Sequence, residues 1–191
     1  MNRPRPRSTL MVVLTAVAAV LAGLVTPAAA AAPYCGITWG SLAEVGTGTD
    51  SEVLTGVRAG RHDCFDRLVI DLNGQDISFR SYDVRYVGRV VEDGSGRVVP
   101  LRGGADLQIV VRAPAHDQYG NPTYTPGNRA ELVDVGGWTT FRQVAWAGSF
   151  EGQTTVGLGV RARLPFRVLT LDGVPRSGEG PRLVIDVAHR W

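Results

Sequence analysis

The sequence predicts an all-β protein: a single antiparallel β-sandwich domain that follows an N-terminal signal peptide. Short segments rich in branched and aromatic residues recur along the chain, and Gly, Pro, Asn and Asp separate them as turn residues do. No segment beyond the N-terminal 31 residues sustains the 3.6-residue apolar period of an amphipathic helix. With 191 residues, the chain is long enough for one substantial core and hardly long enough for two.

The N-terminus has the pattern of a secretory signal peptide. Three arginines precede an uncharged apolar stretch at residues 10–25, and small residues at 28–32 offer an A-x-A cleavage site. The apolar stretch is shorter than the roughly 20 residues of a membrane span, so we expect no stable membrane anchor. We expect a signal peptide at residues 1–31, an N-terminal segment at 32–52 and the sandwich domain at 53–191. The protein is then secreted, with cell-wall association as a further expectation.

Cleavage changes the charge balance. All 20 basic residues are Arg, and removal of the signal peptide leaves 17 of them against 18 acids, a net charge of about −1. Binding to nucleic acid usually needs a basic surface that neutralises phosphates. We therefore expect no nucleic-acid partner.

The only two cysteines, Cys35 and Cys64, both follow the cleavage site. In an oxidising compartment an isolated pair most simply forms a disulfide. A zinc site would need more ligands, and a catalytic thiol would leave the second cysteine unexplained. The disulfide would pin the segment around Trp39, either a short strand or an ordered tail, to the start of the first core strand.

The pentapeptide Arg-Leu-Val-Ile-Asp occurs twice, at residues 67–71 and 182–186, and both copies have the composition of a central strand. Side chains alternate between the two faces of a strand, so the Leu and Ile of each copy point inward and the Arg, Val and Asp point outward. We expect the four inward residues to be fully buried: Leu68, Ile70, Leu183 and Ile185.

The order of the charges favours one pairing of these two strands. An antiparallel pair centred on Val69 and Val184 places the Arg of each copy beside the Asp of the other, whereas a parallel pair places like charges together. Alternatively, the two copies lie in different sheets, as duplicated halves of the sandwich. If they pair, their outer face suits hydrogen bonding to sugar hydroxyls and peptide carboxylates. The candidate ligand-binding residues on it are Arg67, Asp71, Arg182 and Asp186.

The remaining strands are read from alternation and turn residues. A Gly/Thr-rich run before residue 50 reads as a loop, and Asp-Gly-Ser-Gly at residues 93–96 marks a hairpin. Besides the two copies, we expect strands at residues 53–59, 82–87, 90–91, 98–99, 105–112, 141–147, 154–163 and 166–171.

Residues 116–130 contain two Pro, two Gly and two Asn, so we expect a long loop, which is usually functional or disordered. Aromatic rings in loops often stack on sugar rings, although a loop tyrosine more often packs locally. We take Tyr119, Tyr124 and Trp138 as candidate ligand-binding residues. Three arginines between residues 161 and 167 either meet anionic carboxylates or form a solvated strand face.

Enzymatic chemistry has little support. Ser149 with Asp186 and His189 would make a hydrolase triad, but the surrounding residues 148–152 lack the G-x-S-x-G elbow. The three histidines lack the spacing of metal ligands. We expect no enzymatic activity, no cofactor and no metal.

Several segments together resemble the AMIN-like domain of small exported actinobacterial proteins. The matching segments are residues 35–42, 60–71, 82–87, 149–152, 157–160, 165–168 and 182–187. AMIN relatives are β-sandwich modules attached to cell-wall amidases and secretion proteins, where they are associated with peptidoglycan binding and localisation in the envelope. The resemblance implies a β-sandwich and an envelope role, and it supplies no catalytic residues.

Three functions remain in competition. The first is an exported, non-enzymatic envelope module that binds peptidoglycan or another wall component. The second is a secreted interaction domain whose partner is another exported protein. The third is an enzyme of unrecognised type with a site near the long loop.

Overall fold

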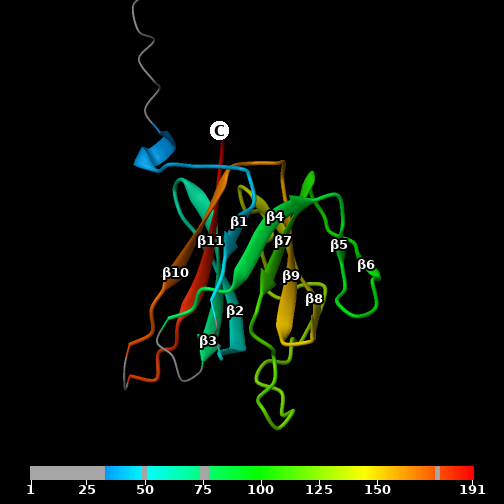
Figure 1. Ribbon diagram of the computed structural model, residues 1–191. Coiled ribbons are helices and arrows are strands. Elements are labelled where there is room, and N and C mark those ends of the chain that lie inside the picture. The colour runs from blue at the N-terminus through cyan, green and yellow to red at the C-terminus, as the bar shows by residue number, and fades with distance from the viewer. Residues whose placement is uncertain (1–32, 49–50, 74–77, 175–176) are drawn as a thin grey trace, which may run out of the picture. The chain divides into compact units, whose positions relative to one another are not determined.

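β-strands make up the regular structure of the described residues, apart from a single 3₁₀ turn, η1 (Tyr34–Gly36). The computed structural model describes residues 33–48, 51–73, 78–174 and 177–191, so the predicted signal peptide lies outside the described residues. Two antiparallel sheets pack as a sandwich (Figure 1), which confirms the predicted fold class.

The first sheet has five strands in the order β1-β4-β7-β9-β8. Its longest strand, β8, lies at one edge and pairs only with β9. The strands are β1 (Glu44–Gly46), β4 (Tyr82–Val87), β7 (Ala105–Val111), β8 (Phe141–Phe150) and β9 (Gln153–Val160). A small hairpin of β5 (Val90–Val91) and β6 (Val98–Val99) extends from this part of the chain, as the Asp-Gly-Ser-Gly turn predicts.

The second sheet has four strands in the order β10-β11-β3-β2. The two Arg-Leu-Val-Ile-Asp copies form its two central strands, because branched side chains pack well on a pleated sheet between neighbouring strands. The strands are β2 (Val53–Arg61), β3 (Phe65–Asn73), β10 (Phe166–Leu171) and β11 (Arg182–Ala188).

The core fills the space between the two sheets. Leu68, Ile70, Leu183 and Ile185 have no exposed surface, which confirms the inward face predicted for both copies. The five-stranded sheet contributes apolar residues from its own inner face, and three phenylalanines add the largest buried side chains: Phe79, Phe141 and Phe166.

The N-terminal segment is ordered, and it touches both sheets. A disulfide joins Cys35 to Cys64, with Cα atoms 6.4 Å apart, as the sequence predicts. Gly40 forms a bridge with Phe166 of β10, and the Glu44 carboxylate accepts the backbone N–H of Val168 at 3.1 Å. Strand β1 pairs with β4.

The sequence analysis placed a loop where β1 forms. Three residues with a terminal glycine carry no propensity signal, and the strand exists because it pairs with the edge of β4. Gly46 is required there, since a Cβ at this position would lie 2.2 Å from the carbonyl oxygen of Arg80.

Candidate functional site

Strands β3 and β11 pair in the register that their charges favour. They are antiparallel neighbours with Val69 opposite Val184, Arg67 opposite Asp186 and Asp71 opposite Arg182. The alternative, in which the two copies lie in different sheets, is wrong. The outer face of the four-stranded sheet therefore carries all four of the charged residues predicted from the repeat.

Asp186 is the centre of this face, and two arginines hold it. Arg67 donates from Nε and Nη2 at 2.6 and 2.9 Å, and Arg167 of β10 donates from Nε at 2.9 Å. The Asp186 side chain has no exposed surface, while those of Arg67 and Arg167 keep 26% and 27%. The sequence analysis placed Asp186 on the outer face of its strand, and there the two arginines and the neighbouring strands cover the carboxylate.

Asp71 has a different partner from the one expected. It accepts two hydrogen bonds from Arg58 of β2, at 2.8 and 2.9 Å, and these bonds raise the pKa of Arg58. Arg182 lies opposite Asp71 in the register, yet its Nε atom is buried and has no hydrogen-bond partner among the described residues. The second predicted ion pair does not form.

Two hollows meet at Arg182. One, of about 360 Å³, is lined by Arg58, Asp71 and Arg182 together with residues 178–180 before β11. The other, of about 280 Å³, has Val69 and Val184 among its apolar lining and carries His62, Arg58, Arg67 and Arg182. Arg58 and Arg182 line both hollows.

We call this surface the arginine face, and we define it by six residues: Arg58, Arg67, Asp71, Arg167, Arg182 and Asp186. Four cations face two carboxylates, and both carboxylates are already bonded. The face has a formal excess of two positive charges. Such a surface can bind carboxylate or phosphate oxygens through guanidinium groups.

Aromatic rings border the arginine face at the end near the disulfide. Arg167 lies 5.4 Å from the ring centres of both Trp39 and Phe65, and Arg67 lies 5.2 Å from that of Phe65. His62 stacks on Phe65 with ring centres 4.5 Å apart. These contacts hold the arginines in place through cation–π attraction.

A comparison with protein families gives one match: the AMIN-like domain profile covers residues 52–189. The chain belongs to the AMIN-like domain family. Comparison with curated proteins and with solved structures found no match. The match covers the whole sandwich except β1, so the arginine face is a surface of the AMIN-like domain itself.

The aromatic candidates do not join the arginine face of this AMIN-like domain. Tyr119 lies at the tip of the long loop with 81% of its surface exposed, and Trp138 stacks on Phe141 beside the core. Tyr124 packs against Trp146, with ring centres 5.6 Å apart. The long loop is ordered, because the Asp117 side chain accepts the backbone N–H groups of Tyr119 and Asn121, both at 2.9 Å.

Sequence reasoning missed two residues of the arginine face, Arg58 and Arg167, as parts of one site. The three arginines between residues 161 and 167 were considered as one group, but they separate. Arg161 donates to the carbonyl of His189 and Arg163 to that of Ser41, and only Arg167 reaches Asp186. The alternation within β10 would have placed Arg167 outward, but its position opposite Asp186 depends on the β10–β11 register.

The three residues of the hydrolase triad considered above, Ser149, Asp186 and His189, have separate bonding partners in the AMIN-like domain. The Ser149 hydroxyl accepts the N–H of Ala115 at 3.0 Å, while a ring nitrogen of His189 lies 3.2 Å from the Asp66 carboxylate. Asp186 is held by arginines. In the residues that the structure describes, no group of three or more His, Cys, Asp or Glu is arranged to hold a metal ion.

One observation bears on where the AMIN-like domain is located. The Cys35–Cys64 disulfide agrees with an extracytoplasmic, oxidising compartment. The described part of the chain contains no helix with the length and hydrophobicity that a membrane span requires.

Proposed function

We propose that this AMIN-like domain is an exported, non-enzymatic module that binds an anionic component of the cell wall through the arginine face. Arg182 carries the proposal. Its Nε atom is buried without a hydrogen-bond partner among the described residues, next to two open hollows. A buried unsatisfied donor costs about 1–3 kcal/mol, and a carboxylate that accepts this N–H recovers that cost on binding.

The chemistry of the face favours the carboxylates of peptidoglycan stems. A guanidinium binds a carboxylate through two parallel N–H···O bonds, and Arg182 makes no ion pair with another described residue, since Asp71 opposite it is bonded to Arg58. The apolar surface of Val69 and Val184 can cover the aliphatic part of a short peptide. Membership of the AMIN-like family supports an envelope role.

Co-sedimentation with purified cell wall tests the proposal. The parent protein should sediment with intact wall and stay in the supernatant when the wall has first been digested with muramidase. Arg182→Ala should lose most of this binding. The matched control is Arg85→Ala, which removes one exposed arginine from β4 of the other sheet and should bind as the parent does.

Arg182→Ala should also keep its fold, because the Arg182 side chain makes no hydrogen bond or ion pair with another described residue. We expect a change in unfolding free energy within about 1 kcal/mol, measured by urea denaturation. If the folded variant binds wall as strongly as the parent, the arginine face is not the binding site, and attention moves to Tyr119, Tyr124 and Trp138.

A further inference from the structure

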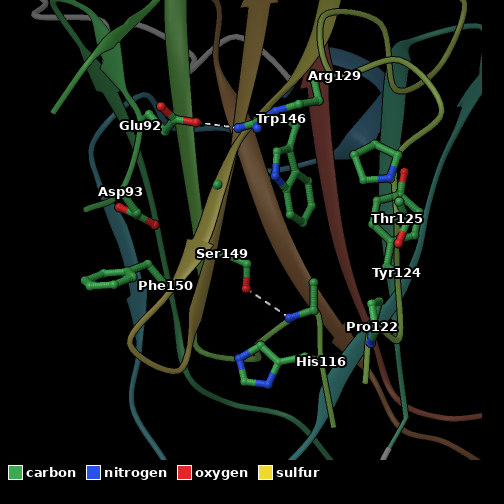
Figure 2. A pocket seen from close by; sticks show the side chains of 13 residues that line it. Glu92, Asp93, His116, Pro122, Tyr124, Thr125, Arg129, Trp146, Ser149 and Phe150 are labelled. Carbon is green, nitrogen blue, oxygen red and sulfur yellow. Dashed lines mark hydrogen bonds and ion pairs between the residues drawn. The ribbon is translucent and has the colours of Figure 1, made fainter. Parts of the chain in front are cut away.

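A third hollow lies on the other sheet, along the edge strand β8. Its volume is about 450 Å³, within the roughly 300–1,000 Å³ typical of small-ligand sites. We call it the loop cleft. Figure 2 shows Trp146 near its centre, with Glu92, Asp93 and Phe150 on one side and the long loop with Tyr124 on the other.

Backbone hydrogen bonds hold both walls of the loop cleft against β8. On the loop side, the carbonyl of Arg129 accepts the N–H of Trp146 at 2.7 Å. On the hairpin side, the N–H of Asp93 donates to the carbonyl of Ala147 at 3.0 Å, and Glu92 forms an ion pair with Arg129 across the cleft. The cleft is therefore formed before any ligand arrives, which lowers the entropic cost of binding.

Trp146 gives the loop cleft an unpaired donor. Its side chain packs in the core and the residue is only 8% exposed, and its indole N–H makes no hydrogen bond to another described residue. Buried tryptophans usually find a partner for this group. The Tyr124 hydroxyl, from the ring packed beside Trp146, also lacks a partner in the part of the chain that is described, and partial burial raises its pKa.

The charges of the loop cleft select the class of ligand. Glu92 is neutralised by Arg97 and Arg129, and Asp93 already accepts a hydrogen bond from Thr155 at 2.6 Å. The cleft lacks the excess of cations that marks the arginine face. Phe150 adds an apolar ring that is 49% exposed. The cleft thus combines aromatic surface with unpaired hydroxyl and indole groups, and its charges nearly balance. These properties suit an uncharged ligand that has both apolar and hydroxyl-bearing faces.

We propose that the loop cleft binds a neutral sugar ring of a glycan, with the Trp146 indole N–H donating to a sugar oxygen and the rings of Tyr124 and Phe150 contacting the sugar from opposite walls of the cleft. This site goes beyond the proposed function. It shares no residue with the arginine face, and it takes a neutral ligand where that face takes an anion.

Nuclear magnetic resonance of ¹⁵N-labelled protein tests the proposal, because each of the four tryptophans contributes one indole N–H signal. The probes are N,N′-diacetylchitobiose and cellobiose, both uncharged. With at least one of them, the Trp146 signal, assigned by its loss in Trp146→Phe, should shift saturably while that of Trp39 stays in place. No shift with either sugar up to about 20 mM, where a millimolar site is nearly full, overturns the proposal.

Variants then separate contact from folding. Trp146→Phe keeps a ring but removes the donor and should weaken sugar binding by about two- to tenfold, followed through the other shifted signals. Phe150→Ala, at an exposed position, should also weaken it without affecting the core. The matched control is Trp191→Phe, which removes an exposed indole outside the cleft and should bind as the parent does. Unchanged affinity in both cleft variants would refute the assignment.

The proposals for the arginine face and for the loop cleft can be refuted independently. Arg182→Ala should lose wall binding and keep the sugar-induced shift. Trp146→Phe should weaken sugar binding and still sediment with cell wall through the arginine face. If the domain sediments with wall but shows no sugar-induced shift, the proposed function is retained and the proposal that the loop cleft binds sugar is refuted.

Discussion

Replacement of Asp186 by Ala tests whether the arginine face depends on a buried carboxylate. The change removes three hydrogen bonds from Arg67 and Arg167 to a side chain with no exposed surface. Loss of one partner from a buried ion pair costs about 3–5 kcal/mol. Because both arginines keep about a quarter of their surface and can rehydrate, we expect the lower part of that range, about 3–4 kcal/mol.

For a chain of this size, 1 kcal/mol changes the melting temperature by about 2–4 °C, so Asp186→Ala should lower it by roughly 6–16 °C. Circular dichroism during heating and in urea measures both quantities. Asp83→Ala is the control, because it breaks a more exposed pair with Arg85 on the other sheet and should cost about 0–1 kcal/mol. Equal losses in the two variants would refute the view that Asp186 is buried and essential to the sheet.

Two other predictions concern the N-terminal segment. Replacing both Cys35 and Cys64 by Ser should lower the unfolding free energy by about 3.5 kcal/mol, because the disulfide closes a 29-residue separation, and urea denaturation will measure the loss. A loss below about 1 kcal/mol would contradict it. Burial raises the pKa of Glu44, so its contribution to stability is fully present below the unfolded pKa and is lost as pH rises through the folded pKa. Glu44→Gln should therefore gain stability relative to the parent between about pH 4 and 7, and a constant difference across that window would count against it.

The arrangement of the four-stranded sheet was predictable because the repeat carries both a hydrophobic and a charge pattern. The inward Leu and Ile fix the face of each strand, and the outward Arg and Asp fix the direction and register of pairing. The disulfide followed from the cysteine count together with the predicted signal peptide. Each of these features follows from a local sequence pattern together with one pairing, of two strands or of two cysteines.

The partners of the charged residues were not predictable in the same way. Arg58 and Arg167 reach Asp71 and Asp186 from strands β2 and β10, whose registers carry no charge pattern in the sequence. The loop cleft depends on the long loop folding back onto β8, through backbone bonds such as that from Trp146 to Arg129. Backbone bonds of this kind do not depend on residue type, so the loop cleft could not be predicted from the sequence.

The Asp residues of the two copies have different bonding partners because their neighbours differ. Asp186 lies between Arg67 and Arg167, whereas Asp71 lies between Arg182 and Gly56. A glycine leaves room, and the Asp71 carboxylate occupies it: a Cβ at position 56 would lie 3.3 Å from Oδ2 of Asp71. The carboxylate thus leans towards β2 and Arg58, and Arg182 is left without a partner.

Gly56→Val should therefore weaken wall binding without removing an arginine. A branched side chain at this position displaces the Asp71 carboxylate from β2 towards Arg182, which then gains an internal partner and loses its capacity for an external one. Adding Asp71→Ala to Gly56→Val should restore binding, because it removes the competing carboxylate. Co-sedimentation with wall measures both variants. If Gly56→Val binds as the parent does, or the double variant fails to recover while remaining folded, competition between Asp71 and the ligand for Arg182 is refuted.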